Sequence, residues 1–432
     1  MVAYNPDENR INNPKEEFEK RNFWQNKYQN SSNKAKNSAI SPPLENFAHE
    51  TVNFAKFSKE KDKLTRVFHF VVYILDYLYK EITSIGKDIL TEIYLHFWRH
   101  NRHPQKKILG YWDFNQRVSK LGDFLAYLEY LNILRCDFKL DQQNKNIDLC
   151  FIDDETHFNR KQPRFSQSYQ FKKTLKSLFI FNKNIDSVLT FRSNREFERF
   201  YLQNKKRYIR WPPTVSGTLI MDYRAIEKFY RKNSFIPLLE VPREITTEIY
   251  RFYEARVYPA LPIILNVRQN KNHNSARNSN LREIRTFLEH YEQNKTYKFV
   301  IICTKSEVPD DFRKLKNVLI SKDYFSDVEQ DLGLIKTSYL SIFPSSGMAC
   351  FAMFSNVPFL LFGNHGYQEK FTCPKKGKSF NFLSQSQKIY HGQEKTASLI
   401  SSFEELVCYL KEKEINNTAQ MSFPKAMVLR QA

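Results

Sequence analysis

The sequence predicts an α/β protein in which two Rossmann-like domains follow a polar N-terminal extension. Apolar runs rich in Ile, Leu and Val alternate with helical patterns along most of the chain after residue 107, and such alternation favours parallel sheets. The chain has 432 residues, whereas a single hydrophobic core stops growing at roughly 250–300 residues. Prolines cluster between Trp211 and Arg243, so we place a domain boundary near Ser234–Pro242.

We divide the chain into three segments, of which the last two meet at this boundary. Residues 1–66 are rich in Asn, Lys and Glu and have too few apolar residues to offset chain entropy, so we expect a largely disordered extension. Residues 67–236 begin with two runs of helical spacing on either side of Gly86 and continue as the N-terminal Rossmann-like domain. Residues 237–432 make the C-terminal Rossmann-like domain.

In the first domain, the apolar pattern predicts a βαβ unit and then a further strand and helix. Runs with β-branched and aromatic residues indicate strands, and runs that repeat near 3.6 residues indicate helices. In chain order the elements are the strand Ile108–Phe114, the loop Asn115–Gly122, the helix Asp123–Leu134, the strands Ile147–Ile152 and Ser187–Phe191, and the helix Asn194–Leu202.

The second domain alternates more regularly, which predicts a doubly wound parallel sheet. Its expected strands are Leu261–Val267, Phe299–Cys303, Val318–Ser321, Tyr339–Phe343 and Pro358–Phe362. Its expected helices are Ile245–Tyr258, Leu281–Tyr291, Asp327–Lys336, Met348–Phe354 and the closing amphipathic helix Ser402–Lys413.

Two pieces of this second domain look suited to hold an anion. The strand Leu261–Val267 ends in Arg268, and open α/β sheets bind ligands at the carboxyl ends of their strands. The loop that follows carries His273, Arg277 and Asn278. Later, Pro344-Ser-Ser-Gly347 precedes a helix, whose first N–H groups and dipole favour a phosphate. Together these pieces indicate a phosphorylated ligand.

Two acidic stretches follow the strands of the first domain. Gly122-Asp123 is typical of a helix start with an acid in its first turn, but the same position would also let Asp123 face an acceptor as a base. The run Asp153, Asp154 and Glu155 cannot aim at one metal ion from successive strand positions, so we expect these three to be solvated turn residues.

Charge and cysteine content bound the compartment and the partners. The net charge of +20 draws the protein toward nucleic acid, acidic lipid or phosphorylated small molecules. The six cysteines show no Cys-x-x-Cys pair and no metal-type spacing, which favours buried thiols in a reducing compartment. We see no secretory signal and no apolar run long enough for a bilayer span, so we expect a cytoplasmic protein that can also contact the inner membrane face.

A family resemblance can be named on four stretches of the second domain. They are Asn266-Val-Arg268, Arg277-Asn278-Ser-Asn280, Ser345-Ser-Gly347 and Asn356-Val-Pro358. From about Leu238 to Phe362 the chain resembles bacterial GT-B glycosyltransferases of the surface-carbohydrate, fucosyltransferase-like type, and Lys120-Leu-Gly-Asp123 is a weaker match in the first domain. Asn266 stands where the family has a His.

The resemblance implies a glycosyltransferase with two Rossmann-like, GT-B domains, the first binding the acceptor. It implies transfer, with inversion, from a GDP- or UDP-linked sugar to a surface glycan or glycolipid, with no cofactor. Because no Asp-x-Asp occurs near the expected donor cleft, we predict transfer without a metal, in which arginine neutralises the charge. The donor would be held by Arg268, Arg277, Asn278, Ser345, Ser346 and Gly347. Because an arginine suits a diphosphate oxygen, we assign charge neutralisation to Arg268, and the base is Asp123 or His273.

Two other classes stay open. A basic nucleic-acid-binding protein fits the charge and the aromatic content, but we expect no nucleic acid because no zinc spacing or aromatic and basic strand motif is present. A catalytically inactive GT-B scaffold fits the loss of the family His at Asn266. It would bind a donor without turning it over.

Overall fold

The computed structural model describes most of the chain after residue 92, and all of the described residues belong to one compact unit, Thr91–Ala432. The described ranges are 93–99, 105–114, 120–141, 143–153, 169–213, 223–270, 277–304, 307, 310–363, 374 and 378–420. The expected disordered extension and all of the expected helix pair except residues 93–99 lie outside these ranges. Residues 93–99 are helical.

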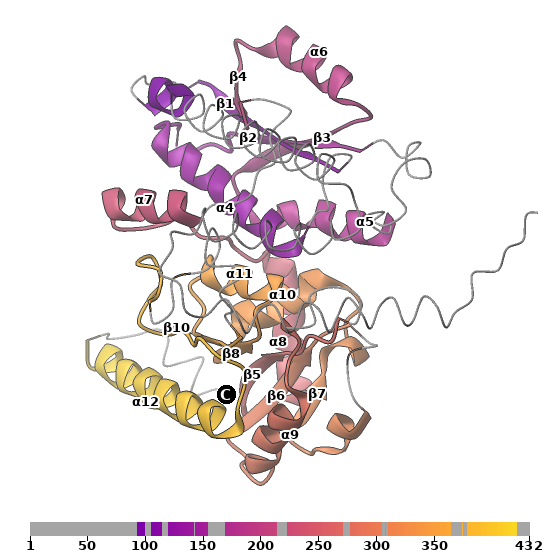
Figure 1. Ribbon diagram of the computed structural model, residues 1–432, viewed down its shortest axis with the longest axis vertical. Coiled ribbons are helices and arrows are strands. Elements are labelled where there is room, and N and C mark those ends of the chain that lie inside the picture. Colours follow the sequence, from indigo (N-terminus) through magenta and orange to yellow (C-terminus); the bar gives the residue numbers. More distant parts are fainter. Residues whose placement is uncertain are drawn as a thin grey trace, which may run out of the picture. The chain divides into compact units, whose positions relative to one another are not determined.

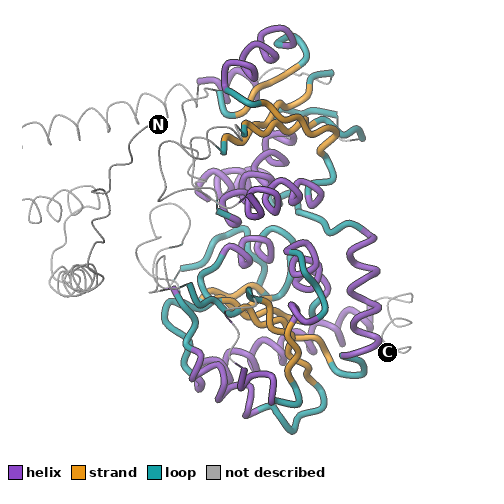
Figure 2. Tube along the Cα trace, turned by 90° about the vertical axis from the view of Figure 1, so that its right-hand side faces the viewer, coloured by secondary structure: helices purple, strands orange, loops and turns teal. Residues whose placement is uncertain are grey.

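The first sheet has four parallel strands in the order β3-β2-β1-β4. The two central strands are buried along almost their whole length, because helices cover both faces of the sheet (Figures 1 and 2). The strands are β1 (Lys107–Asp113), β2 (Ile147–Ile152), β3 (Ile185–Phe191) and β4 (Tyr208–Trp211).

Helix α4 (Leu121–Asp137) belongs to this part of the chain and is buried on nearly all sides. Its first turn follows β1, as predicted, but the helix begins at Leu121, so Leu121 and Gly122 are helical and not loop. The other helices are α5 (Tyr169–Ser177), the short 3-10 helix Leu178–Phe181, α6 (Asn194–Asn204) and α7 (Tyr223–Asn233).

The second sheet has six parallel strands in the order β10-β9-β8-β5-β6-β7. These are β5 (Leu261–Asn266), β6 (Tyr297–Ile302), β7 (Val318–Ile320), β8 (Leu340–Phe343), β9 (Phe359–Leu361) and β10 (Gln387–Ile389). The helices are α8 (Arg243–Arg256), α9 (Leu281–His290), α10 (Val328–Thr337), α11 (Gly347–Met353) and α12 (Thr396–Gln420). The predicted α/β class with two parallel sheets is therefore confirmed. The domain boundary itself stays a prediction.

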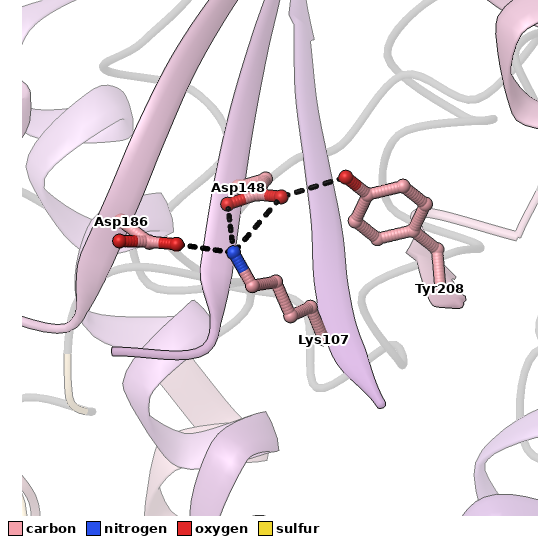
Figure 3. A network of polar contacts seen from close by, with 4 residues as sticks. All are labelled: Lys107, Asp148, Asp186 and Tyr208. Atoms are coloured by element: carbon pink, nitrogen blue, oxygen red, sulfur yellow. Dashed lines mark hydrogen bonds and ion pairs between the residues drawn. The ribbon is translucent and has the colours of Figure 1, made fainter. Parts of the chain in front are cut away.

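A polar network joins all four strands of the first sheet where they begin (Figure 3). Lys107 Nζ donates to Asp148 Oδ1 at 3.1 Å and also to the Asp186 carboxylate. The Tyr208 hydroxyl donates to Asp148 Oδ2 at 2.7 Å. Burial and the charge of Asp148 raise the pKa of Tyr208, so its proton stays in this bond. The network lies at the opposite edge of the sheet from the loops that follow the strands.

One sequence expectation is wrong at the other edge of this sheet. Asp153, expected to be solvated, is only 4% exposed. It accepts hydrogen bonds from Lys172 at 2.7 Å and forms an ion pair with Lys176 at 2.8 Å. The helix α5, which the sequence reading missed, brings both lysines to this carboxylate and satisfies its charge.

A second buried acid is present within α4. Glu129 is fully buried, and neither carboxylate oxygen has a hydrogen-bond partner among the described residues. Burial raises the pKa of Glu129 well above its usual range, although the nearby Asn132 side chain offsets part of this effect. The carboxyl group is therefore held neutral inside the helix packing.

Candidate active site

The loop that follows β5 is closed by hydrogen bonds around Arg268. Its Nη1 donates to Asn278 Oδ1 at 2.6 Å, and its backbone N–H donates to Ser279 Oγ at 3.1 Å. The backbone N–H of Ser279 returns a bond to the Arg268 carbonyl at 2.9 Å. These contacts fix the Arg268 guanidinium at the carboxyl end of β5, where the sequence analysis placed an anion site.

Arg277 joins this loop to the turn after β8. Its Nε and Nη2 both donate to the Ser345 carbonyl oxygen, at 2.8 and 2.5 Å. The predicted donor-binding residues Arg268, Arg277, Asn278 and Ser345 therefore converge on one edge of the second sheet, although up to 77 positions separate them in sequence (345 − 268 = 77). Only a fold that sets β5 beside β8 brings them together.

The two arginines lie close enough to repel each other. Burial, followed by the charge of Arg277, lowers the pKa of Arg268, and the Glu307 carboxylate partly opposes this. Glu307 in turn accepts hydrogen bonds from the backbone N–H groups of Gln269 at 2.9 Å and Thr304 at 3.0 Å. Two like charges held in a half-buried place favour an anion between them.

Asn266 and Ser346 connect the ends of β5 and β8. Asn266 Nδ2 donates to the Ile302 carbonyl at 2.9 Å, and its Oδ1 accepts from Ser346 Oγ at 2.7 Å. The Asn266 amide thus bridges the ends of these two strands and β6. Because the Ser346 hydroxyl donates to Asn266 in this state, a phosphate would be held here by backbone N–H groups more than by this hydroxyl.

The start of α4 packs directly on the start of α11. A Cβ atom on Gly347 would lie 2.8 Å from the backbone nitrogen of Gly122, closer than real Cβ contacts come. A Cβ atom on Gly122 would lie 2.9 Å from Cys350 Sγ and 3.1 Å from the Gly347 Cα atom. Two glycines therefore let the helix that follows β1 touch the helix that follows β8.

This contact brings Asp123 to the arginine side of the site. Burial raises the pKa of the Cys350 thiol to about 11, and the charge of Asp123 adds to this effect, while Arg277 acts in the opposite direction. The Cys350 thiol thus lies within the fields of both charged groups. The Tyr223 hydroxyl is 3.0 Å from Cys350 Sγ and is buried, which raises its pKa well above the usual range, and Asp123 contributes to that rise.

The structure therefore assembles most of the residues that the sequence analysis selected. The described residues include Asp123, Arg268, Arg277, Asn278, Ser345, Ser346 and Gly347. Hydrogen bonds join Arg268 to Asn278 and Arg277 to Ser345, and Gly347 packs on Gly122, the residue before Asp123. His273 lies outside the described residues. Sequence reasoning missed Cys350 and Tyr223. The place of Cys350, three residues after Gly347 and so one helical turn further along α11, could have indicated Cys350, but nothing near Tyr223 in the sequence marks Tyr223.

Two further observations concern metals and membranes. Among the described residues, no group of three or more His, Cys, Asp or Glu side chains is arranged to hold a metal ion. In the same part of the chain, no helix combines the length and the apolar character that crossing a membrane requires.

Comparisons with known proteins found similarity only at the level of solved structures. No protein-family model matches the chain, and no curated protein sequence matches it. The structure of a glycosyl transferase family 9 protein from Veillonella parvula is 10% identical, with 75% of this chain and 92% of that chain covered and a TM-score of 0.41.

Two other solved structures are similar to this chain. The ADP-heptose lipopolysaccharide heptosyltransferase II of E. coli is 12% identical, with 71% of this chain and 99% of that chain covered and a TM-score of 0.44. A fucosyltransferase from Bradyrhizobium is 13% identical, with 60% of this chain and 95% of that chain covered and a TM-score of 0.28. All three are glycosyltransferases by name.

Proposed function

We propose that this protein is a GT-B glycosyltransferase that moves a sugar from a GDP- or UDP-linked donor to a surface-glycan or glycolipid acceptor. The observation that carries the proposal is the pair of arginines at the carboxyl edge of the second sheet. Arg277 is fixed on the Ser345 carbonyl, and Arg268 is fixed on Asn278 beside it. A half-buried pair of guanidinium groups suits a diphosphate, whose two phosphoryl groups carry the charge that both arginines need.

The chemistry that fits this arrangement is a single displacement. An acceptor hydroxyl oxygen attacks the anomeric carbon of the donor sugar, and the bond from that carbon to the diphosphate oxygen breaks. The leaving nucleoside diphosphate gains negative charge, which Arg268 and Arg277 stabilise more strongly in the transition state than in the bound donor. The configuration at the anomeric carbon is inverted.

The acceptor proton goes to a carboxylate in this proposal. Asp123 is the third residue of α4 and stands next to α11 through the Gly122 and Gly347 contact. It is the base that we assign, and His273 is the alternative. The proton passes from the acceptor hydroxyl to an Asp123 carboxylate oxygen as the new glycosidic bond forms.

We propose that transfer needs no metal ion, because the two arginines can supply the positive charge that a metal would otherwise bring. Activity should then be unchanged by EDTA and by added Mg²⁺. A loss of activity in EDTA that Mg²⁺ restores would overturn this part of the proposal and leave the donor site intact.

A thermal-shift panel tests the donor site. The Tm of the wild type, of Arg268→Ala and of the control Arg251→Ala is measured with GDP, UDP, ADP, CMP and their sugars. Arg251 lies on the exposed face of α8. A ligand at a hundredfold excess over its dissociation constant stabilises the folded state by about 2.7 kcal/mol. We expect one diphosphate to raise the Tm of the wild type and of Arg251→Ala but not of Arg268→Ala.

The other outcomes separate the competing functions. Donor binding without transfer to any acceptor in a membrane or glycan extract would favour an inactive scaffold. If no nucleotide raises the Tm while an oligonucleotide does so in a salt-dependent way, the protein binds nucleic acid and the glycosyltransferase assignment is wrong.

A further inference from the structure

The helix α7 carries a strongly basic outer face. Its inner residues Tyr223, Ile226 and Phe229 are buried against the core. Its outer side chains line a shallow pocket and are Arg224, Glu227, Lys228, Arg231 and Lys232. The side chains of Arg231 and Lys232 are 73% and 66% exposed, and each makes only a long ion pair, with Glu227 at 3.8 Å and with Asp137 at 3.9 Å.

The single acid of α7, Glu227, also lines this pocket, where its Oε2 lies 3.8 Å from Arg231 Nε. The Glu227 side chain is only 12% exposed. Asn381 Nδ2 donates to Glu227 Oε2 at 2.6 Å, and the Asn381 backbone N–H donates to the other oxygen. The carboxylate is therefore shared between Arg231 and the segment that precedes β10, and the four cations of the outer face of α7 still outnumber this one acid.

Apolar side chains are exposed at the end of the same helix. Ser234 adopts a φ of 60°, which turns the chain out of α7. Phe235 follows with 51% of its surface exposed, and its ring rests edge-to-face on Phe229 with the centroids 5.6 Å apart. Leu238 is 38% exposed. Exposed apolar groups thus adjoin the basic face.

From this combination we propose that the outer face of α7, with residues 234–238, docks the protein on a membrane leaflet rich in anionic phospholipid. Lysine and arginine contact lipid phosphates, and aromatic and aliphatic side chains enter the interfacial region. A nucleic acid would use the basic residues and an aromatic ring for stacking, but it has no use for an exposed Leu238. The partner that fits all of these groups is the lipid surface.

The position of this face agrees with the proposed reaction. Tyr223, the first residue of α7, contacts Cys350 beside Asp123. The 11 residues of α7 span roughly 16 Å at 1.5 Å per residue, so the docking face begins next to the candidate base. A lipid-linked acceptor held in the bound leaflet would then be presented close to Asp123. This last step rests on the proposed function, whereas docking itself does not.

The test is co-sedimentation of the full chain with vesicles. Vesicles of phosphatidylcholine alone are compared with vesicles of phosphatidylcholine mixed with phosphatidylglycerol. The variant Lys228→Gln/Arg231→Gln/Lys232→Gln removes three cations from the docking face. The control Arg195→Gln/Arg199→Gln/Lys205→Gln removes three exposed cations from α6 and the turn that follows it. Thermal unfolding of each variant shows that the fold is kept.

We expect the wild type and the control to bind the mixed vesicles, and the α7 variant to bind about a hundredfold more weakly, as three lost contacts with anionic lipid imply. Phe235→Ser should lower the binding that remains at high salt several-fold. Equal loss in the α7 variant and the control, equal binding to both vesicle types, or no binding to either would overturn the proposal. Displacement of the vesicles by an oligonucleotide would reassign the face to nucleic acid.

The donor thermal shift separates this inference from the proposed function. The α7 variant should keep the wild-type response to the nucleotide, because its changed residues lie on α7 and not in the loop after β5 that carries Arg268 and Arg277. Vesicle binding through α7 without any nucleotide response would leave the docking face in place while the glycosyltransferase proposal falls.

Discussion

Gly347 and Gly122 lie in direct backbone contact, with the place for a Cβ on Gly347 only 2.8 Å from the Gly122 nitrogen. The contact joins the helices that follow β1 and β8, and it brings Asp123 toward the arginine pair. It makes the site dependent on the absence of two side chains.

Gly347→Ala should therefore damage both stability and donor binding. The clash is with backbone, which cannot move aside as a flexible side chain would, and we expect a loss of about 1–3 kcal/mol in the free energy of unfolding. Urea unfolding measures it. Gly392→Ala is the matched control, since a Cβ there meets nothing within 4 Å, and it should change the free energy of unfolding little. Equal effects of the two substitutions would contradict the backbone clash.

Arg277→Lys should weaken nucleotide binding nearly as much as Arg277→Ala. The Ser345 carbonyl accepts two bonds from the planar guanidinium, and a single ammonium cannot hold the same orientation while also facing a phosphate. We expect a loss of at least about tenfold in nucleotide affinity for both variants, measured by titration calorimetry. Full affinity in Arg277→Lys would show that only charge matters at this position.

Asp123→Asn should lower the rate of transfer by about a hundredfold or more, because a general base is lost. Nucleotide binding should stay intact. A second measurement on the Asp123→Asn variant needs no substrate. The Asp123 charge adds to the burial that raises the pKa of the Cys350 thiol to about 11, so its removal should lower that pKa. Alkylation of Cys350 by iodoacetamide should then become faster at a given alkaline pH.

Mass spectrometry can follow this alkylation with the exposed Cys408 as an internal reference. The rate at Cys408 should not change between wild type and Asp123→Asn. An unchanged rate at Cys350 would mean that Asp123 does not reach the thiol in solution.

Glu129→Gln should stabilise the protein at neutral and alkaline pH. The folded pKa of Glu129 is raised, so the folded state keeps its proton where the unfolded state releases it. Stability is then lost as pH rises above the ordinary carboxyl pKa of about 4.3. The amide removes this dependence, with a gain of about 1–3 kcal/mol near pH 8 and little change near pH 4. Chemical unfolding at the two pH values measures the difference.

Asp148→Asn should cost much more stability than Asp186→Asn. Both carboxylates bind Lys107, but the Asp148 side chain is 2% exposed and the Asp186 side chain is 46% exposed. Removal of the buried partner costs about 3–5 kcal/mol, whereas an exposed pair contributes about 1 kcal/mol or less. Nucleotide thermal shifts should survive in both variants, because the network lies away from the loops that form the site.

Much of the fold could be read from the sequence because strong apolar runs mark buried parallel strands. Leu261–Asn266 is a strand almost as predicted, and Arg268 lies two residues after its end. Weak or charged elements were missed: α5 carries three lysines in nine residues, and β4 and β10 have only four and three residues. Their positions depend on tertiary contacts, such as the one between Asp153 and Lys172, that no local pattern contains.

Part of the candidate site could also be predicted from the sequence, and part could not. Arg268, Arg277 and Ser345 were selected because they follow strands, and parallel strands end at one edge of a sheet. The tie of Arg277 to a backbone carbonyl, and the neighbourhood of Asp123, Cys350 and Tyr223, depend on how α4, α7 and α11 pack. Side-chain partners that are 68 or 127 positions apart in the sequence leave no periodic trace.

The ion network of Lys107, Asp148, Asp186 and Tyr208 also bears on how the chain avoids misfolding. Slippage of β2 by one residue would turn the Asp148 side chain to the other face of the sheet and leave a buried carboxylate without its cation. The wrong registers are thus penalised by charge as well as by lost apolar contacts. Since this discrimination operates where the strands start, the loops at their far ends are free to diversify in sequence, and new substrate preferences can arise there without endangering the order of the strands.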